Sequence, residues 1–208
     1  MDQRTDEWFS ARLGKVTASR MADLMAQTKS GYSASRANYM AELICERLTG
    51  ERAEKFSNAA MQWGTETEPQ ARAAYSFMTD ADVTECGFFD HPEIAMFGAS
   101  PDGLVGEDGL VEIKCPNVAT HLETLLGGTV PAKYVTQMQV QMACTGRQWC
   151  DFVSFDPRLP SDLQMFVQRV ARSDEAIETI ETETIKFITE MDAKIADLRA
   201  RYMQKDAE

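Results

Sequence analysis

Three side chains suited to metal-assisted chemistry, Asp102, Glu112 and Lys114, lie close together in the sequence. Between them, the segment Gly106–Gly109 predicts a turn, because glycine permits positive φ and Asp favours a local turn hydrogen bond. The segments on either side should therefore pair as a β-hairpin. Side chains alternate along a strand, so Glu112 and Lys114 should share one face while Ile113 enters the core on the other. The register can bring Asp102 to the same face as Glu112.

This hairpin could hold a hard cation. The carboxylates of Asp102 and Glu112, with the backbone carbonyl of Ile113 between them, form the all-oxygen ligand set that Mg²⁺ requires. One or two ions could bind, and Mn²⁺ can substitute because it accepts oxygen ligands in octahedral geometry. Lys114 could orient a water or stabilise charge developing on a phosphate. The bare spacing also fits a structural hairpin that carries an exposed ion pair.

The sequence around the hairpin resembles a known nuclease core. Residues 99–116 are similar to the active-site hairpin of the PD-(D/E)XK nucleases, in the branch of phage lambda exonuclease and the YqaJ-like viral recombinases. Further blocks occur in the order of that family, and the resemblance covers about residues 6–160. These blocks are Trp8, Arg12-Leu13-Gly14, Thr17-Ala18-Ser19, Trp63-Gly64, Glu68, Tyr134, Gln137 and Gln139.

The resemblance implies roles for residues outside the hairpin. Arg12 resembles the arginine that grips the 5'-phosphate of the degraded strand, and Ser19 and Ser100 resemble hydroxyl donors to the same phosphate. Gln137 resembles a glutamine that reaches from a helix into the active site. Glu68 resembles an outer acid that supports the metal cluster directly or through water.

Each of these residues also has a structural alternative. The two tryptophans of the matching blocks, Trp8 and Trp63, are expected in the core. The alternatives are an ion pair with Glu7 for Arg12, a helix cap for Ser19, a turn hydrogen bond for Ser100, a polar helix face shared with Gln141 for Gln137, and a carboxylate at a helix N-terminus for Glu68.

Length and composition restrict the possible classes of protein. The 208 residues suit a single domain over residues 1–208. Five cysteines, an odd number without a Cys-x-x-Cys pair, argue against a zinc site and a disulfide framework. The two histidines, His91 and His121, are too few for a histidine metal site and are expected in loops or at the surface. With no apolar stretch of membrane-spanning length and no signal-peptide core at the start, the protein is expected to be cytoplasmic.

The net charge of −12 opposes a nucleic-acid enzyme, because duplex affinity comes largely from neutralising phosphates. The charge is unevenly distributed. Residues 1–60 hold nine Lys/Arg and eight Asp/Glu, so the acidic excess lies in residues 61–208. Bound cations would neutralise part of that excess at Glu68, Asp102 and Glu112. A basic DNA path on an otherwise acidic protein is therefore compatible with the composition.

Hydrophobic periodicity predicts helices on both sides of a small mixed sheet. A helix is expected over residues 35–49, and a second one should begin at a cap in residues 57–58 and run to about residue 77, with a kink or a fresh start at Pro69. Other elements are expected at 82–89, 94–101 and 110–115 (strands), 130–143 (helix), 148–155 and 163–170 (strands), and beyond Ser173 (a long amphipathic helix with Ile177, Ile180, Phe187, Met191, Ile195, Leu198 and Tyr202 on its apolar side).

Pattern and resemblance together predict an α/β (α+β) fold with a restriction-endonuclease-like core. The expected activity is that of a Mg²⁺-dependent 5'-to-3' exonuclease that acts on double-stranded DNA ends and leaves 3' single strands for recombination by annealing. The resemblance further implies a ring-shaped homotrimer, a phage or prophage role and a single-strand annealing protein as partner.

Two other functions stay open from the sequence. The core hairpin is shared with structure-specific and restriction-like endonucleases, although Arg12, Ser19 and Gln137 favour an exonuclease. A non-catalytic acidic interaction protein on a nuclease-like fold is the other possibility, and the complete set of Asp102, Glu112 and Lys114 argues against it.

Overall fold

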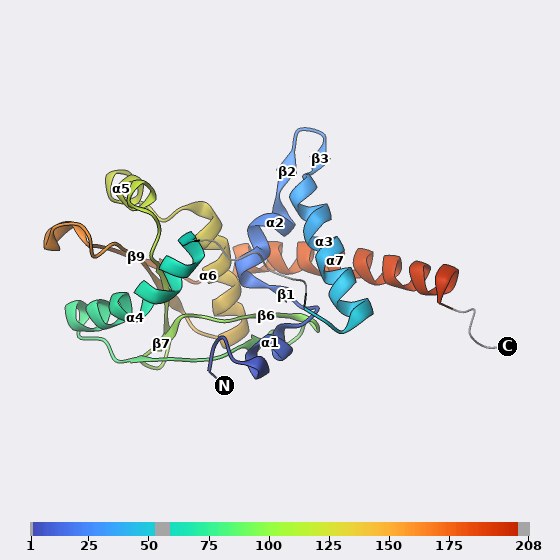
Figure 1. Cartoon of the computed structure of the whole chain (residues 1–208), viewed down its shortest axis with the longest axis horizontal. Helices are drawn as coiled ribbons and strands as arrows, with labels where there is room; N and C mark the ends of the chain where they lie inside the picture. The colour runs from blue at the N-terminus through green and yellow to red at the C-terminus, as the bar shows by residue number, and fades with distance from the viewer. Residues whose placement is uncertain (1, 53–58, 204–208) are drawn as a thin grey trace.

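The computed structural model describes residues 2–52 and 59–203, and it combines helices and strands in the mixed arrangement that the sequence predicts (Figure 1). The predicted helix cap at Ser57 and Asn58 lies outside the described residues. The helices are α1 (Asp6–Arg12), α2 (Met21–Met25), α3 (Ala34–Thr49), α4 (Ala59–Thr79), α5 (Val118–Gly127), α6 (Ala132–Thr145) and α7 (Asp174–Tyr202), with short 3₁₀ turns at Ala18–Arg20 and Ser161–Leu163.

The main sheet has five strands in the order β10-β9-β8-β7-β4. Its centre is the predicted hairpin, in which β7 and β8 pair antiparallel with Gly103 opposite Val111. This register places Asp102 opposite Glu112, as expected. The strands of this sheet are β4 (Val83–Thr84), β7 (Gly103–Val105), β8 (Gly109–Lys114), β9 (Trp149–Phe155) and β10 (Met165–Ala171).

A second sheet of three strands, in the order β1-β6-β5, was not predicted. It contains β1 (Val16–Thr17), β5 (Phe89–Asp90) and β6 (Phe97–Ala99). The expected strand at 82–89 is thus two short strands, β4 and β5, in different sheets. The segment from Ser100 to Asp102 joins β6 of one sheet to β7 of the other. Two predicted site residues, Ser100 and Asp102, therefore lie at the junction between the sheets. The remaining strands, β2 (Gln27–Thr28) and β3 (Gly31–Tyr32), form a separate hairpin.

Helices cover both faces of the main sheet. Strands β8 and β9 are parallel and need a crossover connection, which α5 and α6 supply. Helix α6 packs on the face of Leu110, where Met138 and Met142 join Phe152 in an apolar cluster. Helix α4 packs on the opposite face through Ala71 and Tyr75, against a cluster that includes Val111, Ile113 and Val153. Alternation along β8 therefore directs Glu112 toward α6, which lies at the centre of the molecule (Figure 1).

The turn of the hairpin uses its two glycines for different reasons. Gly106 has a φ of +53°, which confirms the positive φ expected for a turn glycine. Gly109 has no such φ, but a Cβ at this position would lie 2.1 Å from the Trp149 ring. Arg147 also donates to the carbonyl oxygens of Val105, Gly106 and Gly109, at 3.2, 3.0 and 2.6 Å. The conformation of the turn is thus stabilised by Arg147, just before β9, as well as by the turn's own glycines.

Several local expectations need correction. Helix α4 is continuous through Pro69, so a fresh start there is wrong, and Figure 1 shows the helix changing direction along its length. Helix α5 was not predicted. It carries His121, which is completely buried and contacts Ser154 Oγ at 2.7 Å and the Leu163 carbonyl at 2.9 Å. His91 is buried too, against Glu181. His121 therefore contradicts the expected placement in a loop or at the surface, whereas His91 lies in a loop as expected, although it is buried.

Helix α7 has the predicted position and amphipathic character over most of its length. Ile180, Phe187 and Ile195 are buried among the residues of the largest apolar cluster. Leu198 and Tyr202 are instead exposed, because the end of α7 extends beyond α3 (Figure 1). In the part of the chain that the structure describes, no helix has the length and apolar character needed to cross a membrane.

The burial pattern of α7 predicts a large difference between two truncations on the same helix. Phe187 is completely buried and stacks on Tyr39, with ring centroids 5.6 Å apart, so Phe187→Ala should lower the free energy of unfolding by about 3–5 kcal/mol. Leu198→Ala, at an exposed position, should change it by less than about 0.5 kcal/mol. Urea unfolding of both variants measures the difference, and similar losses would contradict the placement of Phe187 in the core.

Candidate active site

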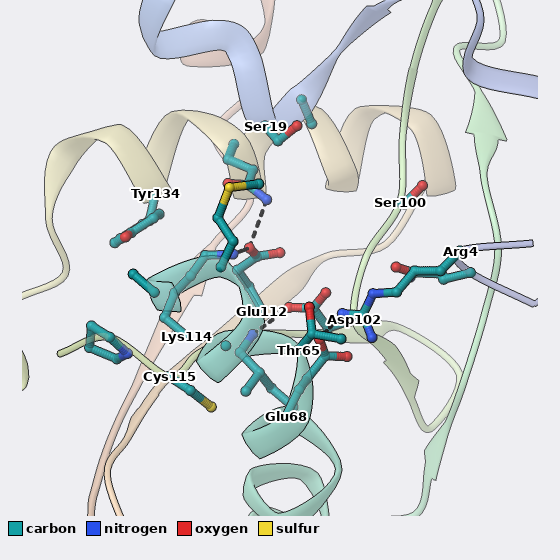
Figure 2. A pocket seen from close by; sticks show the side chains of 18 of the residues that line it. Arg4, Ser19, Thr65, Glu68, Ser100, Asp102, Glu112, Lys114, Cys115 and Tyr134 are labelled. Atoms are coloured by element: carbon teal, nitrogen blue, oxygen red, sulfur yellow. Dashed lines mark hydrogen bonds and ion pairs between the residues drawn. The ribbon is translucent and has the colours of Figure 1, made fainter. Parts of the chain in front are cut away.

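All nine residues predicted for the site line one cavity of about 630 Å³. Glu112 lies near its centre, with Lys114 on one side and Asp102 and Glu68 on the other (Figure 2). Ser19 and Ser100 lie further out in the same view. The nine residues are Arg12, Ser19, Glu68, Ser100, Asp102, Glu112, Ile113, Lys114 and Gln137.

Glu112 is completely buried, which is unusual for a carboxylate without strong partners. Its Oε1 accepts a hydrogen bond of 2.7 Å from Gln137 and forms an ion pair with the Lys114 ammonium. Its Oε2 accepts a hydrogen bond of 2.5 Å from Gln141. The alternative of an exposed structural ion pair is therefore wrong. The two glutamines occupy one face of α6, and that face is directed at the carboxylate and not at solvent.

Asp102 and Lys114 complete a charged cluster around Glu112. Asp102 Oδ2 accepts the backbone N–H of Ile113 at 2.7 Å, which fixes the carboxylate against β8. Burial raises the pKa of Asp102 to about 8, with repulsion from Glu112 and Glu68 adding to the shift and Lys114 opposing it. Burial works to lower the pKa of Lys114, but the carboxylates of Glu112 and Asp102 outweigh it and the pKa is raised. One ammonium thus faces two carboxyl groups.

This donor set fits a divalent cation. Two carboxylates and the Ile113 carbonyl are hard oxygen ligands, and a cation between them would relieve the repulsion that raises the pKa of Asp102. No cluster of three or more His, Cys, Asp or Glu side chains suited to a metal occurs in the described residues. A cation would therefore need the backbone carbonyl and water beside the two side chains.

A second group of residues that line the cavity is built around Arg12, at the end of α1. Its guanidinium lies 4.1 Å from the Trp8 ring, one turn earlier, and donates to Ser100 Oγ at 3.0 Å. Trp8 Nε1 donates to the same oxygen at 2.9 Å. Trp8 is therefore a wall of the cavity and not the core residue that we expected. No carboxylate among residues 2–52 and 59–203 forms an ion pair with Arg12, so the predicted alternative with Glu7 is wrong.

The environment of Arg12 favours an anionic ligand. Burial lowers the pKa of Arg12 to about 10, which still leaves it charged at neutral pH. Ser100 Oγ already accepts two hydrogen bonds, so its own hydrogen is available to an acceptor in the cavity. Ser19 is exposed and contacts Thr17 Oγ1 at 3.4 Å, and it does not cap a helix. Three donors thus face the same space.

Glu68 occupies the middle of α4, so the alternative of a carboxylate at a helix N-terminus is wrong. Arg4 donates to its Oε2 at 2.5 Å and Arg72 to its Oε1 at 2.8 Å. Both oxygens therefore have a positively charged partner. Arg4 comes from the chain start, has a φ of +68° and reaches into the cavity beside Asp102 (Figure 2).

Sequence reasoning missed several residues of this site. Gln141 follows Gln137 by four positions and Trp8 precedes Arg12 by four, so helical spacing could have paired both with known site residues. Tyr134, which belongs to a matching block but was given no role in the site, lines the cavity. Arg4 carried no local signal, because its contact with Glu68 spans 64 positions of the chain.

A family model matches residues 7–148 of the chain, and it describes the YqaJ-like viral recombinase domain. The chain belongs to this family. The matched range contains all nine predicted site residues. Among curated proteins, none matches the chain.

Solved structures of similar proteins agree with the family. The alkaline exonuclease LHK-Exo of Laribacter hongkongensis is 60% identical, with a TM-score of 0.90 over 96% of this chain and 99% of that one. LHK-Exo in complex with dAMP gives a TM-score of 0.91 at the same identity and coverage. A phage-related exonuclease of Haemophilus somnus is 16% identical, with a TM-score of 0.70 over 88% and 96% of the two chains, and shares the fold. The predicted nuclease-like fold is therefore confirmed.

The raised pKa of Asp102 predicts a pH effect on stability without metal. Because the folded-state pKa, about 8, exceeds the unfolded value near 3.9, ionising Asp102 opposes folding, and stability is lost as the pH rises from about 4 to about 8. Asp102→Asn keeps a side-chain oxygen that can accept the Ile113 N–H, and it removes the stability loss that comes from ionising Asp102. In EDTA, its unfolding temperature should therefore exceed that of the wild type increasingly from pH 5 to about pH 8 and then level off. Glu107→Gln, in the exposed turn, should follow the wild type, and a parallel decline of Asp102→Asn and the wild type would contradict the assignment.

Proposed function

We propose that the protein is a metal-dependent deoxyribonuclease that removes nucleotides from the 5' ends of duplex DNA and leaves 3' single strands. The observation that carries the proposal is one cavity lined by two carboxylates and Lys114 and also by Arg12, which donates to Ser100 and forms no ion pair with a carboxylate among the described residues. The 60% identical relative, LHK-Exo, is an alkaline exonuclease, which supports cleavage from an end. One of its structures is a complex with dAMP, a mononucleotide of the kind that stepwise degradation would release.

Asp102, Glu112 and the carbonyl of Ile113 would hold one or two Mg²⁺ ions, with Mn²⁺ as a substitute. Such an ion supplies a Lewis acid for the phosphate and lowers the pKa of a bound water. Lys114 keeps its proton and places a positive charge beside Glu112, where it would stabilise negative charge that develops on the scissile phosphate. Gln137 holds the Glu112 carboxylate, and Glu68 would act as an outer acid through water, since both its oxygens already bind arginines.

The donors around Arg12 would bind the 5'-terminal phosphate. Arg12 offers a planar set of donors, and Ser19 and Ser100 offer hydroxyls. Trp8 would fix Arg12 and Ser100 in place through its ring and its Nε1. A phosphate held there would position the adjacent phosphodiester over the carboxylates.

The family resemblance supports three further parts of the proposal. The protein would act inside a bacterial cell in phage-type recombination, and it would assemble as a homotrimeric ring around its substrate. It would also work with a single-strand annealing protein that coats the exposed 3' strand.

One assay on DNA of defined topology tests the proposed function. The protein should degrade linear duplex in Mg²⁺, release mononucleotides and stop in EDTA. A covalently closed circle of the same sequence should stay intact, because it has no 5' end. Cleavage of the circle would indicate an endonuclease, and no cleavage of either DNA would indicate a non-catalytic interaction protein.

The carboxylates should be essential for turnover. Asp102→Asn and Glu112→Gln each remove a ligand charge with little change in volume, so each should lower turnover on linear duplex more than a hundredfold while folding and duplex binding persist. Residual turnover above about a hundredth of the wild type would mean that less than roughly 3 kcal/mol of transition-state stabilisation was lost. That result would exclude the carboxylate as a metal ligand. Glu107→Gln serves as the control.

Lys114 should act mainly on the transition state. Lys114→Ala should lower turnover without weakening Mn²⁺ or duplex binding to a comparable degree. Lys114→Arg should restore turnover only in part, because a planar guanidinium replaces a compact point charge. Lys133→Ala changes an exposed lysine outside the cavity and should keep wild-type turnover. Wild-type turnover of Lys114→Ala would show that Lys114 has no role in the reaction.

Arg12 should matter most on phosphorylated ends. An arginine–phosphate bond contributes about 1.5–3 kcal/mol, so Arg12→Ala should slow degradation roughly ten- to a hundredfold on a 5'-phosphate and much less on a 5'-hydroxyl. Single-turnover digestion of duplexes that differ only in this phosphate measures the effect. Equal slowing on both ends, or a wild type that ignores the phosphate, would remove the proposed role of Arg12.

A further inference from the structure

Helix α6 carries three alternate glutamines, at positions 137, 139 and 141, and they fall on two faces. Residues four apart lie on one side of a helix, so Gln137 and Gln141 share a face that Gln139 does not. Gln137 and Gln141 both donate to Glu112, at 2.7 Å and 2.5 Å. Gln139 instead donates to the Ala171 carbonyl at 2.9 Å and accepts the Ser173 N–H at 2.9 Å. Only two of the three glutamines therefore contact the candidate site.

Gln141 and Gln137 hold different oxygens of Glu112. A carboxylate has about four lone-pair positions. Gln137 and Lys114 contact Oε1, whereas among the residues that the structure describes only Gln141 donates a hydrogen bond to Oε2. One position on Oε2 is left for another partner. Without Gln141, the carboxylate could rotate about its last bond, and the direction of that position would no longer be fixed.

The amide of Gln141 is itself oriented from both ends. Gln141 and Cys150 are completely buried, and the Cys150 thiol donates to Gln141 Oε1 over 3.9 Å. This contact directs the NH₂ group of the amide toward Glu112. A neutral amide holds the carboxylate without adding positive charge, whereas a second lysine or arginine there would repel a divalent cation.

We propose that Gln141 is a positioning residue that fixes the Glu112 carboxylate for a divalent cation. The inference rests on the proposed function in taking Glu112 as a cation ligand. Loss of a residue that orients a metal ligand typically weakens metal affinity about ten- to a hundredfold. Gln141 should therefore affect the binding of the cation even before DNA is present.

The test measures Mn²⁺ binding to the DNA-free protein by electron paramagnetic resonance. Gln141→Met keeps the length of the side chain and removes the donor, and it should weaken Mn²⁺ binding at least about tenfold. Gln139→Met is the matched control, since it is equally buried and loses two hydrogen bonds on the same helix. It should lower the unfolding temperature and leave Mn²⁺ affinity unchanged. If Gln141→Met does not fold, Gln141→Asn, with a shorter amide, should show the same weakening.

The outcomes separate this inference from the proposed function. Wild-type Mn²⁺ affinity in the Gln141 variants would overturn the positioning role. An equal loss of affinity in Gln139→Met would also overturn it, because the effect would then follow general destabilisation. Glu112→Gln should abolish the site. If it binds Mn²⁺ as the wild type does, Glu112 is not a ligand and the proposed function fails first.

Discussion

The burial of the Glu112 carboxylate is the constraint on which the rest of the site depends. Removing an ionised carboxylate from water is unfavourable by several kcal/mol unless charges and hydrogen bonds replace the water. Lys114 supplies a charge from the same strand, and α6 supplies two amides through Gln137 and Gln141. Burial, together with repulsion from Glu112, raises the pKa of the second carboxyl group, Asp102, although Lys114 opposes the shift. A divalent cation held between the two carboxylates would balance their negative charge.

Two connections in the fold bring the partners of Glu112 to the site: the crossover between β8 and β9, and the junction between the two sheets. The parallel pairing of β8 with β9 requires a crossover, and the crossover brings α6 onto the face of the sheet that carries Glu112. The junction between the two sheets places Ser100 and Asp102 two residues apart, and both line one cavity. Helix α1 then reaches Ser100 through Trp8 and Arg12. Cation ligands and anion donors thus share one space.

The sequence predicted the parts that local patterns determine. The alternation in β8, the turn at Gly106 and the helical spacing of α6 gave the correct hairpin and helix, and the resemblance supplied the outlying Arg12 and Ser19. Features that depend on distant partners were missed. Residues 82–90 are divided between two sheets because β4 pairs with β7 and β5 pairs with β6. His121 is buried because Ser154 and Leu163, both far along the chain, satisfy its two nitrogens. The pairing of Arg4 with Glu68 likewise joins residues far apart in the sequence.

The central claim is that Asp102, Glu112 and the Ile113 carbonyl form a divalent-cation site, and anomalous scattering from Mn²⁺-soaked crystals tests it most directly. A manganese peak bonded to both carboxylates and to that carbonyl is the predicted result. Crystals in which manganese binds elsewhere, or in which Glu112 keeps only Lys114 and its two glutamines as partners at saturating Mn²⁺, would contradict the account.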